Sequence, residues 1–105
     1  MTISFELGGQ EFTALNGGPE FKFTEAISLV VNCEDQAEVD RLWNQLTADG
    51  GEESMCGWLK DKFGVSWQII PAILPKLLND PSRAERVTQA FLQMRKFDIE
   101  KLLSA

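Results

Sequence analysis

Apolar and polar residues alternate near the N-terminus of the chain. In residues 3–7 (ISFEL) and 11–15 (EFTAL), apolar side chains recur at about every second position, as in a strand with one buried face. Gly8 and Gly9 lie between these segments, and glycine readily adopts the positive φ that a tight turn needs. The pattern predicts a β-hairpin, followed by an exposed glycine-containing loop over residues 16–25.

The next segment changes from a strand pattern to a helix pattern. Residues 26–31 (AISLVV) are mostly apolar and rich in β-branched side chains, which predicts a strand buried on at least one face. Asp35 and Glu38 have the spacing of a capping box at a helix N-terminus. Apolar residues then follow at helical spacing: Val39, Leu42, Trp43 and Leu46. The glycine pair at 50–51 ends the predicted helix.

Three short strands are predicted after this helix. They cover residues 52–56, 57–60 and 65–70, with a turn between the second and the third. The order from residue 26 onward is therefore strand, helix and three strands. This order favours an α+β fold.

The C-terminal third has the pattern of helices. A short helix is predicted over 73–78, and Asp80 followed by Pro81 resembles an N-cap with proline at the first helical position. An apolar stripe follows: Ala84, Val87, Phe91 and Met94. Asp98 is the predicted cap of a final helical turn.

Length and charge limit the protein class. A chain of 105 residues is long enough for one domain with a hydrophobic core. Its net charge of −6 argues against nucleic acid or an anionic membrane as a partner, because both favour Lys and Arg. No long apolar run or secretion signal is visible, so we expect a cytoplasmic protein.

The missing residue types limit the chemistry. The chain has no His and no Tyr, so it lacks an imidazole base and the usual zinc ligand. Its two cysteines, Cys33 and Cys56, are expected to be free thiols rather than a disulfide. Catalysis would have to use carboxylates, lysines, these thiols or a divalent metal held by oxygen ligands.

Three segments carry a resemblance to a known family: LNGGPEFKFTEAISLVVNCEDQAEVDRLW, GGEE and CGWLKDKFGVSWQIIP. They resemble the βαβββ module of the vicinal oxygen chelate superfamily, which includes glyoxalase I, extradiol dioxygenases and fosfomycin-resistance proteins. Within this superfamily, the sequence of these segments is most similar to the PhnB-like branch, whose members are often labelled 3-demethylubiquinone-9 3-methyltransferase. The resemblance implies a vicinal oxygen chelate module with an extra N-terminal hairpin and C-terminal helices.

The chain differs from this family in its organisation. Members usually carry two modules, whereas here residues 1–16 correspond to the closing hairpin of the first module and residues 26–71 to a complete second module. Residues 72–105 form the C-terminal helices of the same single domain. A truncated product or a natural short form would both leave an open sheet edge, which invites pairing with another chain. We therefore expect a homodimer, with exchanged elements as one way of forming it.

The resemblance also points to positions for metal ligands. Gln68 stands where many relatives have a ligand glutamate, and Ala26 stands near a ligand histidine. Neither is a strong ligand, so a metal centre like that of glyoxalase I is not expected. Glu6, Asn16 and Gln68 are the remaining oxygen donors that a divalent metal would use, if they converged across a dimer.

Alternation along the strands predicts which side chains face the cupped side of the sheet. Ser66 and Gln68 share one face of their strand, and Trp67 faces the helix that carries Trp43. Trp58 is either a core residue or a wall on which a ligand stacks. The predicted cavity residues are Ser28, Val30, Trp58, Ser66 and Gln68.

Three functional hypotheses follow from these observations. The first is a small-molecule-binding protein with a cup completed by dimerisation. The second is a metal-assisted lyase, isomerase or dioxygenase of the same superfamily, and the third is a partial protein without activity of its own. The methyltransferase label lacks support, because no glycine-rich turn leads from a strand directly into a helix.

Overall fold

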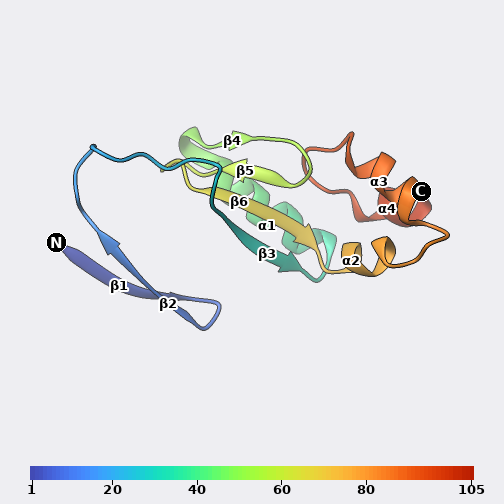
Figure 1. Cartoon of the computed structure of the whole chain (residues 1–105), viewed down its shortest axis with the longest axis horizontal. Helices are drawn as coiled ribbons and strands as arrows, with labels where there is room; N and C mark the ends of the chain where they lie inside the picture. Colours follow the sequence, from blue (N-terminus) through green and yellow to red (C-terminus); the bar gives the residue numbers. More distant parts are fainter.

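The computed structural model describes all 105 residues, Met1–Ala105, as two separate sheets and four α-helices. The molecule measures 52 × 26 × 24 Å, with a radius of gyration of 15.7 Å. A compact chain of this length would have a radius of gyration of about 13 Å. The N-terminal hairpin accounts for the elongation, because it extends away from the rest of the chain (Figure 1). None of the helices has the length and apolar character needed to cross a bilayer.

The hairpin consists of β1 (Thr2–Leu7) and β2 (Gln10–Leu15), which pair antiparallel. Phe5 lies opposite Phe12, and their rings stack with centroids 5.6 Å apart. No hydrogen bond joins the hairpin to the other sheet. A two-stranded ribbon of this kind is only marginally stable in water without further packing.

The larger sheet contains four strands in the order β3-β6-β5-β4. β3 and β6 are parallel, whereas β6–β5 and β5–β4 are antiparallel. The helix α1 follows β3 and is joined to β4 by a short 3-10 turn. The strands and helix are β3 (Ser28–Cys33), α1 (Gln36–Thr47), β4 (Glu52–Glu53), β5 (Trp58–Lys60) and β6 (Ser66–Pro71). The predicted βαβββ order and the α+β class are confirmed.

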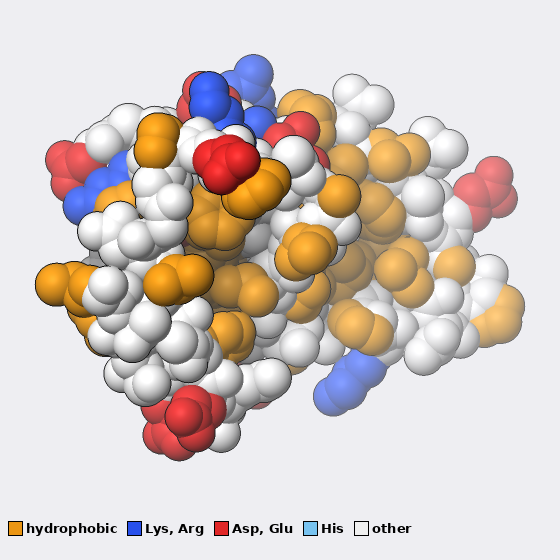
Figure 2. All heavy atoms as spheres, turned by 60° about the vertical axis from the view of Figure 1, so that its left-hand side comes forward, with side chains coloured by type: hydrophobic (Ala, Val, Ile, Leu, Met, Phe, Trp, Pro, Cys, Tyr) orange, Lys and Arg blue, Asp and Glu red, His pale blue; other side chains and the backbone are white.

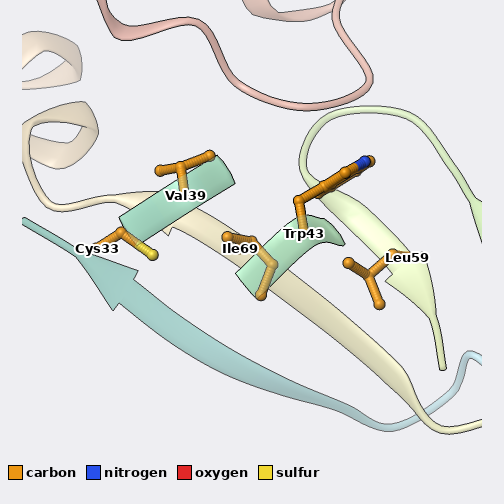
Figure 3. Packing of buried hydrophobic residues seen from close by; sticks show 5 residues of the cluster. All are labelled: Cys33, Val39, Trp43, Leu59 and Ile69. Carbon is orange, nitrogen blue, oxygen red and sulfur yellow. The ribbon is translucent and has the colours of Figure 1, made fainter. Parts of the chain in front are cut away.

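α1 covers one face of this sheet because its apolar stripe faces the strands. The Asp35 carboxylate accepts a hydrogen bond from the Glu38 N–H at 2.9 Å, which confirms the predicted helix cap. Five buried residues form the core between the helix and the sheet (Figure 3): Cys33, Val39, Trp43, Leu59 and Ile69. Trp67 packs against the same cluster, as its position in the alternation predicted.

Several strand boundaries differ from the predictions, and the start of β3 and the end of β4 are two of them. β3 begins at Ser28 rather than at residue 26, and β4 ends at Glu53 rather than at residue 56. The second difference has a backbone cause, because Cys56 adopts a positive φ of 57° that a regular strand does not allow. The chain turns there, and the Trp58 N–H donates to the Met55 carbonyl at 3.1 Å.

Three short helices follow the sheet: α2 (Ile73–Leu78), α3 (Ala84–Phe91) and α4 (Ile99–Ser104). They enclose a second core of five residues: Leu74, Leu77, Val87, Phe97 and Leu102. Asp98 caps α4, with its carboxylate accepting from the Lys101 N–H at 3.2 Å, so this prediction is confirmed.

The predicted helix start at Asp80 is wrong. α3 begins only at Ala84, and residues 81–83 form a turn. The Asp80 carboxylate accepts from both the N–H and the hydroxyl of Ser82, at 3.0 and 2.7 Å. Its side chain therefore stabilises the turn before the helix instead of capping the helix itself.

The two cores are joined where the segment before α4 crosses the start of β5. The N–H groups of Cys56 and Gly57 donate to the carbonyls of Met94 and Arg95, at 2.7 and 2.8 Å. Gly57 has a positive φ of 81°, and a Cβ built there would lie 2.4 Å from the Phe97 ring. Glycine is therefore required both by the backbone conformation and by the close contact.

Replacement of Gly57 tests this contact. Gly57→Ala should lower the free energy of unfolding by roughly 2–4 kcal/mol, because the added methyl group overlaps Phe97 and the backbone is strained. Gly64→Ala is the matched control, since Gly64 has a similar φ of 88° but no other residue closer than 4.0 Å. It should cost only about 1 kcal/mol. Denaturant unfolding measures both values, and equal losses would show that Phe97 does not restrict this position.

Candidate functional site

The face of the larger sheet opposite α1 carries the candidate site. Strand register places Val30 and Trp58 on either side of Gln68, and Ser28 and Lys60 on either side of Ser66. These residues alternate with Leu59, Trp67 and Ile69, which pack toward the helix. We call the surface formed by Ser28, Val30, Trp58, Lys60, Ser66 and Gln68 the open face.

A polar pocket lies at the β5 side of the open face. It has a volume of about 170 Å³, and Trp58, Lys60 and Ser66 contribute to its lining. Glu25, from the segment before β3, and Glu52, from β4, also line it. We call this hollow the Trp58 pocket.

An ion pair lies in the wall of the Trp58 pocket. The Lys60 Nζ is 2.8 Å from the Glu25 Oε1. The hydrogen bond and the charge of Lys60 hold the pKa of Glu25 below its usual value, and the same pair raises the pKa of Lys60. Glu52 lies opposite Lys60 in the β4–β5 register and adds a second negative charge. At neutral pH the carboxylates therefore outnumber the ammonium group.

Ser66 is the least satisfied polar residue of the pocket. Only 1% of its surface is exposed, and its hydroxyl has no hydrogen-bond partner in the protein. A buried hydroxyl without a partner costs free energy, on the order of 1–3 kcal/mol. A polar atom in the pocket would provide the missing partner.

A second hollow lies between the hairpin and β3. It has a volume of about 780 Å³ and is mainly apolar. Leu7 and Phe12 contribute from the hairpin, Val30 from β3, and Leu42 and Leu46 from α1. Figure 2 shows hydrophobic side chains gathered around a hollow on this side of the molecule. We call it the edge groove.

Four of the five predicted cavity residues line one or the other of these two hollows. Trp58 and Ser66 line the Trp58 pocket, whereas Val30 and Ser28 line the edge groove. Gln68 lies between them, and its amide Nε2 donates to the Ser28 Oγ at 2.9 Å. The five residues share one face of the sheet but do not line a single cavity.

Three charged residues of the pocket were missed from the sequence. Glu25 lies in a segment predicted only to be an exposed loop, and Lys60 ends a predicted strand without any role at the site. The neighbouring Glu53 carboxylate accepts from the Trp43 Nε1–H at 2.7 Å on the helix side. Only the β4–β5 register, however, brings Glu52 next to Lys60.

The three oxygen donors considered for a metal do not lie together in the fold. Glu6 is in β1 and Asn16 follows β2, whereas Gln68 is in β6 and is bonded to Ser28. No group of three or more His, Cys, Asp or Glu side chains in the chain is arranged to hold a metal ion. The residues of one chain therefore do not fit a metal centre of the glyoxalase type.

Both cysteines are free thiols, as predicted. Cys33 is fully buried, and burial, reinforced by the nearby Glu38 carboxylate, raises its pKa to about 11. Its thiol is therefore protonated near neutral pH and unreactive. Cys56 is half-buried.

Comparison with known proteins places this arrangement in a family. The family model described as 3-demethylubiquinone-9 3-methyltransferase matches residues 1–70. The solved structure of the PhnB protein from Bacillus cereus is similar with 38% identity and a TM-score of 0.63, over 69% of this chain. The chain belongs to the PhnB-like branch of the glyoxalase superfamily.

A second structure supports the fold of this PhnB-like chain. Protein PA1353 from Pseudomonas aeruginosa matches 68% of the chain with 24% identity and a TM-score of 0.55. The alignments cover 64% of the Bacillus cereus chain and 62% of PA1353, so the PhnB-like chain spans less than two thirds of either relative. No curated protein matches the sequence.

The two thiols should differ in reactivity. With a thiol reagent such as dithionitrobenzoate at pH 8, Cys56 should react in the native protein, and Cys33 only after denaturation. The reason is that Cys33 is inaccessible and its pKa of about 11 lies far above the reaction pH. Cys56→Ser should remove the fast reaction and leave the slow one. Equal rates for both thiols in the native protein would contradict the described burial of Cys33.

Proposed function

We propose that this PhnB-like chain binds a small molecule at the Trp58 pocket and that a second copy of the chain completes the binding cup. The buried hydroxyl of Ser66 is the main support for a ligand at this position, because it has no partner within the protein. A polar atom of the ligand takes the place of that partner.

The pocket lining indicates the kind of molecule that fits. The half-buried Trp58 offers a flat apolar surface, on which a ring or an aliphatic group can pack. Ser66 offers a donor and an acceptor at the base of the same pocket. Glu25 and Glu52 outnumber Lys60, so a neutral or cationic molecule is favoured over an anion.

The size of the pocket supports the participation of a second copy. Its volume of about 170 Å³ is below the roughly 300–1,000 Å³ of most small-molecule sites. The sheet ends after four strands, and the hairpin does not extend it by hydrogen bonds. A second copy beside the sheet would supply an opposite wall and enclose the ligand more fully.

Binding is preferred to an enzymatic reaction for reasons of residue chemistry. The donors considered for a metal do not converge within one chain, and Gln68 is already bonded to Ser28. The methyltransferase description of the family is not adopted as an activity, because β3 leads into α1 through Glu34 and Asp35 without a glycine.

Replacement of Ser66 tests the ligand position. Native mass spectrometry of protein purified without chelators should first reveal a retained small molecule, which is then titrated back while the intrinsic tryptophan fluorescence is recorded. Ser66→Ala should weaken binding by roughly 2- to 10-fold, as expected for one hydrogen bond. The free energy of unfolding without ligand should stay constant or rise, because an unpartnered buried hydroxyl is removed.

Two further variants control this experiment. Ser104→Ala changes an exposed serine of α4, far from the pocket in the fold, and should leave the affinity unchanged. Trp58→Phe should remove the ligand-dependent change in fluorescence and leave the constant emission of Trp43 and Trp67. An unchanged affinity in Ser66→Ala, with full response in the wild type, would contradict ligand contact at Ser66.

A further inference from the structure

The Trp58 pocket already holds one ammonium group, that of Lys60. Its Nζ lies 2.8 Å from the Glu25 Oε1, in the wall of the pocket. The two side chains are 38% and 61% exposed, and ion pairs with such exposure contribute little to stability. Another ammonium group can therefore take the place of Lys60 at Glu25 with little loss of stability of the fold.

The charge of the pocket favours this exchange. Glu52 also lines the pocket and takes part in neither of the two ion pairs of the chain. The pKa of Lys60 is raised mainly by Glu25 and additionally by the charge of Glu52, so both carboxylates act on an ammonium group at this place. With these two carboxylates and one ammonium group, this part of the pocket needs one more positive charge to become neutral.

The pocket also lacks a hydrogen-bond donor at the Ser66 hydroxyl. Ser66 lies opposite Lys60 in the β5–β6 register, is 1% exposed and has no partner for its Oγ in the protein. Ionised carboxylates such as Glu25 and Glu52 only accept hydrogen bonds, and the Lys60 ammonium group is directed to Glu25. The partner that the protein does not provide is therefore a donor, which an N–H group of a ligand supplies.

We propose that the Trp58 pocket binds a small primary amine as its ammonium ion, which replaces Lys60 at Glu25 and donates a further hydrogen bond to Ser66. This inference rests on the proposed function, because it names the class of molecule that occupies the same pocket. A primary ammonium group has three N–H donors, so it can reach a carboxylate and the hydroxyl together. A quaternary ammonium ion has no N–H and would leave Ser66 without its donor.

The size of the pocket and Trp58 limit the carbon part of the amine. A volume of about 170 Å³ corresponds to about six groups of the size of a water molecule, at roughly 30 Å³ each. This is enough for an ammonium group and a chain of about four carbons. The half-buried indole of Trp58 provides the apolar surface on which such a chain packs.

Titration with n-butylamine tests the inference, and the neutral n-butanol is the matched probe of equal chain length. The intrinsic tryptophan fluorescence of the full chain reports binding, at constant pH and ionic strength. Butylamine should bind at least about 5-fold more tightly than butanol, because hydrogen bonds that involve charged groups are stronger than neutral ones. Equal affinities for the two probes would overturn the preference for an ammonium group.

Removal of the internal ammonium group is a sharper test. Lys60→Met keeps most of the aliphatic side chain and should raise the affinity for butylamine about 3- to 10-fold, because Glu25 no longer has a partner in the protein. Addition of Glu25→Gln to this variant should abolish the gain. Addition of Glu20→Gln is the matched control, since it removes the same charge from the same exposed segment but Glu20 does not line the pocket. Circular dichroism verifies that the variants keep the fold.

The results separate this inference from the proposed function. A Lys60→Met variant that gains no affinity for butylamine, or a gain that Glu20→Gln removes as fully as Glu25→Gln, would overturn the exchange at Glu25. A neutral or anionic molecule retained by the purified protein, and bound more weakly after Ser66→Ala, would support the proposed function and contradict the amine alone. If Ser66→Ala leaves the affinity for both butylamine and the retained molecule unchanged, the proposed function fails as well.

Discussion

The structure depends on the close approach of Phe97 to Gly57. At this point the segment before α4 crosses the start of β5, and backbone hydrogen bonds from Cys56 and Gly57 fasten it to the sheet. Gln36 at the start of α1 strengthens the connection, because its amide donates to the Phe97 carbonyl and accepts from the Ile99 N–H, at 2.9 and 2.8 Å. The helix-side core and the C-terminal core are thereby held as one body. Trp58 follows Gly57 directly, so the same contact fixes one wall of the candidate pocket.

The hairpin has no comparable attachment. Ile3, Phe5 and Leu7 point to one side of β1, and each is substantially exposed. The aromatic pair of Phe5 and Phe12 supports the hairpin internally, but a groove of about 780 Å³ separates the hairpin from β3 and α1. The β3 edge that faces it is also unpaired. Both surfaces therefore remain available for further packing, in contrast to the acidic β4 edge.

Local signals in the sequence predicted most of the fold. Asp35 and Asp98 cap their helices because the aspartate side chain can reach an N–H three residues later, which is a property of the local chain. The same reasoning failed at Asp80, where a neighbouring serine competes for the carboxylate. The alternation in β6 placed Trp67 toward the helix and Ser66 and Gln68 on the opposite face. The pairing of Lys60 with Glu25, and the burial of the Ser66 hydroxyl, depend on how distant segments meet and had no local signal.

The open face of this chain differs in its distribution of charge from the metal-binding face that the superfamily resemblance implies. At the position where many relatives carry a ligand glutamate, Gln68 forms a neutral hydrogen bond with Ser28, so the middle of the sheet holds no charge. The charged groups, Lys60 with Glu25 and Glu52, lie at the β5 side. A neutral centre does not attract a cation strongly, whereas the acidic margin still provides an electrostatic preference. The Ser66 hydroxyl lies between these two regions and is the only buried side-chain polar atom without a hydrogen-bond partner. We therefore expect ligand recognition at this site to rely on hydrogen bonding and shape.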